Sequence, residues 1–225
     1  MENVKRMSSR SYRQFCGLAR ALDVVGDRWN LLIVRELLPG PQRYNELKAS
    51  LAGIATNLLA ERLRSLEENG IVERQVGAVG VRYALTPWGA GLREPMEALG
   101  RWGAPLLMRG RDDGDAFQPR WLAGALTALL REVTATPAVE LGVEVEGLLI
   151  VLHVDENGPR AVIQPDRQPD TILTAAPEIV VGLATGAVTI DQAVSQGSLV
   201  GDPRILSRVF RLTRPVGPLP GVYPA

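Results

Sequence analysis

The stretch from Arg43 to Arg82 constrains the fold of this chain more than any other. Its pattern predicts a short helix over residues 44–50, with Leu47 directed inward, and a longer helix directly afterwards. Gly70, which follows Asn69, is a typical end for the longer helix. The apolar side of that helix is formed by three leucines that recur at helical spacing, Leu59, Leu63 and Leu66.

Two short strands are predicted next, over residues 71–75 and 81–85, around a tip that holds turn-forming glycines. Helix, turn, helix and hairpin is the order of elements in a winged helix-turn-helix, which places its second helix in a DNA groove. Alone, the second helix would also fit an ordinary amphipathic surface helix with solvated charges. The hairpin that follows it favours the DNA-binding interpretation.

The candidate DNA contacts are polar or basic residues on this module. At about 100° per residue, the polar side of the second helix lies opposite its leucines, which suits base readout in the major groove. Candidates for the groove are Thr56, Asn57, Glu61 and Arg64, and candidates for phosphate contacts are Arg43, Arg74 and Arg82. The tip of the hairpin carries no charge, although phosphate contacts supply most non-specific affinity.

Several blocks of the first half resemble the HxlR family of bacterial winged-helix regulators, which are relatives of the MarR group. The blocks run from Cys16 to Trp102 in the family's order: CGLARALDVVGDRWNLLIVREL, PGPQRYNELKASLAGIATNLLAERLRSLEENGIVER, YALTPWG and EALGRW. The resemblance implies a transcriptional regulator whose partner is double-stranded DNA.

A further helix is predicted from Thr86-Pro87, with proline at its first position and a kink at Pro95. Its apolar stripe is an intramolecular core by default, but the resemblance implies that this helix pairs with its copy in a second subunit. The expected interface residues are Trp88, Leu92, Met96, Leu99 and Trp102. We therefore expect a twofold homodimer, joined by this helix and the N-terminal one, on half-sites about 34–36 Å apart.

Cys16 lies in a helix predicted over residues 15–25, which precedes a second helix that Asp27 is expected to cap. Arg13 and Arg20 would share its helical face, and positive charge favours the reactive thiolate. Cys16 also matches the N-terminal cysteine that redox- and electrophile-sensing HxlR members use, which makes it a redox candidate. The alternative is a small buried apolar residue.

Charge and composition separate the two halves of the chain. Residues 1–109 carry 16 basic and 11 acidic side chains, a net charge of +5, and residues 110–225 carry 9 and 14, a net charge of −5. The asymmetry suggests that the first half meets a polyanion. One cysteine, no signal peptide and no apolar run of the ~20 residues that span a bilayer predict a cytoplasmic protein without a membrane partner.

The second half follows a polar, turn-rich segment at residues 109–119, so the predicted domains are 1–112 and 113–225. A helix is expected over residues 120–134, followed by strands and then helices. Strands are predicted at 139–145, 148–154, 160–164, 171–174 and 198–200, and helices at 177–185, 190–196 and from Asp202-Pro203 to Phe210. This order indicates an α+β domain with an antiparallel sheet.

This half resembles the sterol carrier protein type two fold, in the segments LLIVLHVDENGPRAVIQP and EIVVGLATGAVTIDQAVSQGSLVGDPRIL. The resemblance implies an apolar tunnel between sheet and helices that takes a hydrophobic small molecule as effector. The candidate lining is Leu149, Val151, Ile163, Ile172, Ile179, Val180 and Leu183. The alternative is that these residues fill a closed core.

The chain lacks the residue sets that catalysis or metal binding would need. Its one histidine, His153, lies in an apolar strand, and its one cysteine lies in the other predicted domain. We therefore predict no enzyme activity, no catalytic residues, no metal and no cofactor. Two other functions stay open: a lipid- or small-molecule-binding protein whose winged helix contacts protein, and an enzyme acting on an apolar substrate. Salt-dependent DNA binding would distinguish the regulator from the first.

Overall fold

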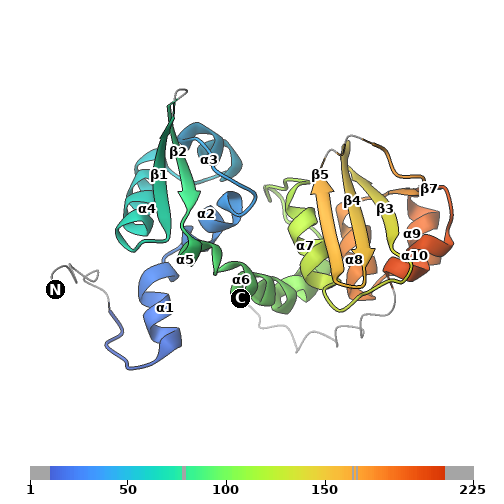
Figure 1. The fold of residues 1–225 in the computed structure, drawn as a ribbon, viewed down its shortest axis with the longest axis horizontal. Coiled ribbons are helices and arrows are strands. Elements are labelled where there is room, and N and C mark those ends of the chain that lie inside the picture. The colour runs from blue at the N-terminus through green and yellow to red at the C-terminus, as the bar shows by residue number, and fades with distance from the viewer. Residues whose placement is uncertain (1–10, 78–79, 164, 166, 211–225) are drawn as a thin grey trace. The chain divides into compact units, whose positions relative to one another are not determined.

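The computed structural model describes residues 11–77, 80–163, 165 and 167–210, and its chain forms two compact units, residues 1–96 and 97–225 (Figure 1). The composition change predicts a boundary after residue 112. The structure divides the chain earlier, because the 3₁₀ helix η1 (Ala104–Arg109) packs against helix α8 (Pro177–Thr185) of the second unit.

The first unit is a helix-turn-helix followed by a hairpin, as the pattern predicts. Its elements are α1 (Gly17–Val25), α2 (Asn30–Leu37), α3 (Tyr44–Ser50), α4 (Thr56–Glu68), β1 (Val72–Gly77), β2 (Gly80–Leu85) and α5 (Pro87–Ala90). Leu47 of α3 and the three leucines of α4 are buried in one core with α2. Replacing any of these leucines by alanine should cost about 2–5 kcal/mol of stability.

The end of α4 is set by Gly70, as predicted. Its φ is +70°, and its N–H donates to the carbonyl of Glu67. The N–H of Ile71 donates to the carbonyl of Leu66, so both last-turn carbonyls are satisfied in the Schellman arrangement. This turn directs the chain straight into β1.

The start of α2 differs from the prediction. Asp27 does not cap the helix with its side chain; the residue at the N-cap is Trp29, which has a φ of +84°. The carboxylate of Asp27 contacts Arg62 of α4 instead. A local capping pattern was therefore overridden by a tertiary ion pair.

The hairpin is antiparallel and is joined at its base by a third segment. Gly77 pairs with Gly80 at the tip end, and Val72 pairs with Leu85 at the base. Gln42 forms a bridge to Tyr83, with N–H···O distances of 2.9 and 2.8 Å. The wing is thus attached to the loop between α2 and α3.

The helical segment after the wing is interrupted before Pro95. Thr86 Oγ1 accepts the N–H of Gly89 and caps α5, as expected for Thr-Pro, but α5 ends at Ala90 and a separate helix, α6 (Arg93–Gly103), follows. Pro95 therefore lies in the first turn of α6, where its missing N–H removes no helical hydrogen bond. The predicted kink at Pro95 is wrong; the break lies at residues 91–92.

The second unit is a mixed helix and sheet domain. Its elements are η1, α7 (Trp121–Leu129), β3 (Val139–Val145), β4 (Leu148–Asp155), β5 (Gly158–Ile163), β6 (Ile172–Thr174), α8, α9 (Ile190–Gln196), β7 (Ser198–Val200) and α10 (Arg204–Val209). The strand order is β5-β4-β3-β6-β7. The prediction of an antiparallel sheet is wrong for one pair, since β6 runs parallel to β3.

The parallel pair arises because β6 does not follow β5 at the same edge of the sheet. The chain crosses from β5 to the far side of β3, and Pro169 on this connection lies directly over Gly142 of β3. A Cβ at Gly142 would be only 2.8 Å from the Pro169 Cγ, so glycine gives the crossing chain its room.

The two faces of this sheet are covered differently. Helices α7, α8 and α10 pack on one face, where their side chains join a core with alternate residues of β3 and β4 (Figure 1). Leu126, Leu141 and Ile150 in this core are fully buried. We call the other side the open face; it carries the side chains that alternate with the core residues, beginning with Glu140 and His153.

Candidate nucleic-acid interface

The start of α4 is held to α3 by hydrogen bonds across the turn. Tyr44 donates its hydroxyl to the carbonyl of Thr56 at 2.6 Å, and the Lys48 ammonium donates to the carbonyl of Ile54. Gly53 in the turn has a φ of +85°, which other residues adopt rarely. These contacts fix the angle at which α4 leaves the turn.

The four residues predicted to read the groove lie together on one side of α4. Thr56, Asn57, Glu61 and Arg64 are all exposed, whereas the leucines on the opposite side are buried. The helix therefore offers hydroxyl, amide, carboxylate and guanidinium groups to a partner. These are the groups that form hydrogen bonds with base edges in the major groove.

Arg62 is a residue that sequence reasoning missed. Its guanidinium contacts the Asp27 carboxylate and lies 3.6 Å from Glu61, and its side chain is only 18% exposed. The buried Nε atom has no hydrogen-bond partner within the described residues. Asp27 and Arg62 are 35 positions apart, so no local pattern indicates the pair. The contact ties the loop between α1 and α2 to the middle of the helix that carries the groove residues.

A second contact of the same loop reaches the turn of the helix-turn-helix. Trp29 lies against Gly53, where a Cβ would be 3.9 Å from the Trp29 Cη2 atom. The Arg28 guanidinium stacks over the Trp29 ring at 5.5 Å from its centroid. The Trp29 ring thus lies against the turn and the Asp27 carboxylate contacts α4, so the loop between α1 and α2 supports both the turn and the helix after it.

The two wing arginines have different surroundings. In the strand register Arg74 is opposite Tyr83 and Gln75 is opposite Arg82, so Arg74 and Arg82 lie on opposite faces of the hairpin. Arg74 forms a bidentate pair with Glu67 of α4, with N···O distances from 2.8 to 3.0 Å, and the hydrogen bond and charge of Glu67 raise the Arg74 pKa. Arg82 is exposed.

The third predicted phosphate contact, Arg43, lies at the N-cap of α3. Its side chain is exposed, and its backbone N–H donates to the Glu46 Oε2 at 2.6 Å. Arg43 and Arg82 are therefore both accessible to a phosphate, while Arg74 would first have to leave Glu67.

Apolar side chains remain exposed on α1 and on the helices after the wing. Leu18 of α1 and Trp102 of α6 are 69% and 75% exposed. Among the expected interface residues, Trp88 and Leu99 are exposed as well, whereas Leu92 and Met96 are half-buried against the core of the first unit. Leu92 and Met96 thus contribute to the fold of their own chain.

The comparisons with known proteins agree with this geometry. The family model for the HxlR-like helix-turn-helix matches residues 24–111. The HTH-type transcriptional regulator YodB of Bacillus subtilis is 41% identical over 85 residues, which cover 36% of this chain and 76% of YodB. The chain belongs to the HxlR family. It is a helix-turn-helix transcriptional regulator that binds DNA.

Further relatives also match less than half of this chain. The uncharacterized HTH-type transcriptional regulator YtfH of Escherichia coli is 31% identical over 108 residues, 45% of this chain and 86% of YtfH. A solved structure of quinone-bound YodB from Bacillus subtilis is 40% identical, covers 38% of this chain and 93% of that one, and has a TM-score of 0.36. YodB and YtfH are both named as HTH-type transcriptional regulators.

Cys16 of this HxlR-family chain is exposed and precedes the first residue of α1. Interaction with the backbone amide of Ala19, and next with that of Leu18, lowers the pKa of its thiol. The expectation that Arg13 shares a helical face with Cys16 is wrong, because α1 begins only at Gly17. Backbone amides at a helix start, rather than an arginine pair, therefore favour the thiolate.

The seven residues predicted to line a tunnel do not surround one space. Leu149, Val151 and Ile172 lie on the open face, where Leu149 and Ile172 approach Gly142, while Val180 and Leu183 of α8 belong to the core on the other face. Ile179 packs at the edge of that core, and Ile163 is 36% exposed at the end of β5. One tunnel with this lining is therefore wrong.

No helix in the described part of the chain is long and apolar enough to cross a lipid bilayer. Within the same ranges, no three His, Cys, Asp or Glu side chains gather as metal ligands would.

Proposed function

We propose that this regulator binds a pseudo-palindromic operator as a homodimer. The observation that carries the proposal is the exposed polar side of α4, whose position is fixed by the turn and by the Asp27–Arg62 pair. A helix held in this way can place the same side chains on each half-site of an inverted repeat. Two copies on half-sites about 34–36 Å apart would read neighbouring turns of the major groove.

Exposed apolar side chains on α1 and α6 support the dimer. Contiguous apolar surface on a water-soluble protein typically marks an interface. Leu18 and Leu22 belong to the exposed face of α1, and Leu99 and Trp102 to that of α6. Each helix by itself offers the kind of surface that a second copy would cover.

The dimer is tested by sedimentation velocity on the Trp102→Glu variant. A charge at this position should shift the protein to the monomer and weaken operator binding, because a buried unpaired carboxylate is unfavourable at an interface. Val200→Glu is the matched control, since Val200 is a similarly exposed apolar residue on β7. A dimer that is unchanged in Trp102→Glu would remove α6 from the interface.

Operator recognition is tested by selecting bound fragments from a random duplex DNA pool with the full chain. An enriched inverted repeat is the expected result. The proposal would be refuted if the folded protein enriched no sequence and its DNA binding did not depend on salt. That result would favour a winged helix that contacts protein.

We also infer a sterol-carrier-like second unit that modulates the regulator through an apolar small molecule. The order β6, α8, α9, β7, Gly201-Asp202 and α10 supports this architecture, because the resemblance implies the same order. The interior between sheet and helices is formed by fully buried apolar side chains such as Leu141, Leu152 and Val180, so an apolar ligand would have to enter among them. A fluorescent neutral lipid should bind and should be displaced by the same lipid without the label; absence of binding would contradict interior binding.

A second candidate function, redox sensing through Cys16, is favoured by the exposure of its thiol and by its lowered pKa. A lower pKa raises the fraction of Cys16 that is thiolate at neutral pH. Cys16 should therefore react with iodoacetamide faster than a free cysteine. Mild peroxide should then change operator affinity in the native protein and not in Cys16→Ser. Unchanged affinity with an oxidised Cys16 would exclude the sensing role.

A further inference from the structure

The open face of the five-stranded sheet carries a row of three charged or titratable side chains. In the register of the strands, Glu140 of β3 is opposite His153 of β4, and His153 is opposite Arg160 of β5. Cross-strand neighbours have Cβ atoms about 4.5–5.5 Å apart, so the three side chains are within reach of one another. A carboxylate, an imidazole and a guanidinium therefore follow each other across the sheet.

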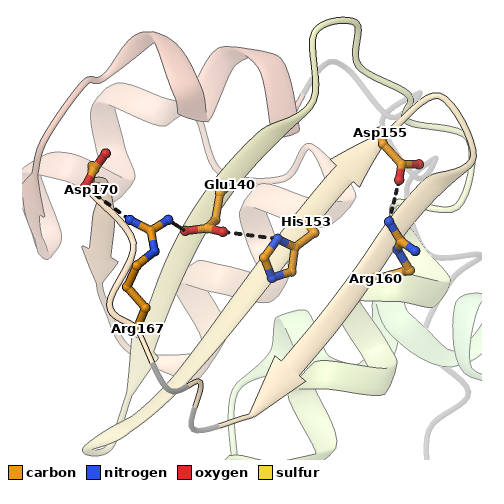
Figure 2. A network of polar contacts seen from close by, with 6 residues as sticks. All are labelled: Glu140, His153, Asp155, Arg160, Arg167 and Asp170. Atoms are coloured by element: carbon orange, nitrogen blue, oxygen red, sulfur yellow. Dashed lines mark hydrogen bonds and ion pairs between the residues drawn. The ribbon is translucent and has the colours of Figure 1, made fainter.

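Each carboxylate around this row already has a cation or an imidazole as partner (Figure 2). Glu140 Oε2 lies 3.2 Å from His153 Nδ1, and its Oε1 accepts from Arg167 at 3.0 Å. Asp155 accepts from Arg160 at 2.5 Å. Asp170 lies 3.8 Å from Arg167. The acceptors on this face are thus largely engaged.

The donors keep more capacity than the acceptors. The Arg160 side chain is 72% exposed, and its contact with Asp155 uses one of the five N–H groups of a guanidinium. The contact between Glu140 and Nδ1 orients the His153 ring so that Nε2 lies on the side away from Glu140 (Figure 2). The remaining N–H groups of Arg160 therefore suit an incoming group that accepts hydrogen bonds, and Nε2 of His153 adds a donor only when the ring carries both protons.

A groove of about 540 Å³ lies beside this row. Cavities of roughly 300–1,000 Å³ are typical of small-molecule sites. Besides the charged residues, apolar atoms line the groove, including the exposed side chains of Ala138 and Val162. Polar donors at one place and apolar surface next to them suit a ligand with an anionic head and an apolar body.

We propose that this groove binds a small carboxylic acid with an apolar body, whose carboxylate lies between Arg160 and His153 and whose body covers Val162. Arg160 supplies charge-assisted hydrogen bonds to the carboxylate. His153 adds a second donor when its imidazole is protonated, with Glu140 holding the ring in place. The site goes beyond DNA recognition, since it lies within the second unit and its occupancy is measured without DNA.

The test uses the fact that His153 is the only histidine of the chain. Its imidazole C–H signals can be identified in the proton NMR spectrum of the full chain without further labelling. Phenylacetate is the probe, and phenylacetamide and acetate are the matched compounds that lack the charge and the apolar body. Phenylacetate should shift the His153 signals saturably, and at equal concentration each matched compound should shift them much less.

Variants assign the contacts by calorimetry. Arg160→Gln should weaken phenylacetate binding by about tenfold or more, as expected for loss of a charge-assisted hydrogen bond. Arg204→Gln is the control and should bind normally, because Arg204 is also an exposed arginine paired with an aspartate, Asp202, but lies on α10.

Three results would overturn the proposal. His153 signals that do not respond to phenylacetate would exclude binding in the groove. Equal binding of phenylacetamide or acetate would exclude an anionic ligand with an apolar body. Normal binding by Arg160→Gln would exclude the assigned carboxylate contact. None of these readouts depends on DNA, so failure of the operator selection would leave them unchanged.

Discussion

The two wing arginines should contribute unequally to DNA affinity. Both side chains are exposed, but Arg74, on the face of the hairpin opposite Arg82, is held by Glu67 through contacts of 2.8 to 3.0 Å. A guanidinium that already has a carboxylate partner would have to lose it before it binds a phosphate. We expect Arg82→Ala to weaken binding to all DNA sequences alike and Arg74→Ala to have a smaller effect.

The magnitude follows from counterion release. Each phosphate contact contributes about 0.9 to the slope of log K against log salt on duplex DNA. With one Arg82 in each subunit of the proposed dimer, Arg82→Ala should reduce the slope by about 1.8. Between about 50 and about 200 mM salt, the difference between native and variant affinity should therefore shrink by about tenfold.

The assay is fluorescence anisotropy of a labelled duplex titrated at several salt concentrations. Glu67→Gln is the informative companion, because it releases Arg74 and should increase the slope. A slope that does not change in Arg82→Ala would show that Arg82 is not at a phosphate. A slope that falls equally in Arg74→Ala would show that the Glu67 pair opens at negligible cost on DNA.

Three further variants and one control test the recognition helix, its support and the packing of α5 against Ile71. Arg64→Ala should lose about 1–3 kcal/mol of discrimination between operator and mismatched duplex, measured by competition binding, and equal discrimination would refute a base contact. Asp27→Asn should reduce the free energy of unfolding in urea by about 1–2 kcal/mol, between the values for exposed and buried pairs, and should lower operator affinity. Gly89→Ala places a Cβ 2.1 Å from the backbone oxygen of Ile71 and should cost about 3 kcal/mol, whereas Gly100→Ala, with no atom within 4 Å, should not destabilise.

The first unit was predictable because its signals are local. The leucine spacing of α4, the glycine that ends it and the Thr-Pro start of α5 each act within a few residues. The support of α4 was not predictable, because Asp27 and Trp29 act through contacts with Arg62 and Gly53 that are distant in sequence. A side chain that can cap a helix locally gives no sign that it pairs elsewhere.

The helical segment after the wing could be predicted from the sequence only in part. A stripe of large apolar residues continues from Trp88 through Trp102, so the periodicity predicts one helix, and Pro95 predicts a kink in it. In the structure the backbone breaks at residues 91–92, and Pro95 is tolerated in the first turn of the next helix. Proline was recognised correctly as a helix breaker, but its effect depends on its position within the helix.

The C-terminal strands were predictable and their faces were not. The run from Leu148 to Val154 is almost entirely apolar, so its composition cannot show which alternate residues meet the helices. The strand register shows which residues of β4 face the helices. Ile150, Leu152 and Val154 are in the core, and Leu149, Val151 and His153 are on the open face.

The two faces of the sheet offer an effector different chemical environments. On the helix side, apolar residues are packed against α7 and α8 without polar donors among the buried strand residues of the core. On the open face, His153 interrupts the apolar alternation of β4 and aligns with Glu140 and Arg160, so that apolar surface and hydrogen-bond donors occur together. A ligand without charge would need the first environment, and a carboxylate would need the second. Binding of phenylacetate to the native chain and to Arg160→Gln, compared with binding of a neutral lipid to both, therefore determines which face of the sheet the chain uses.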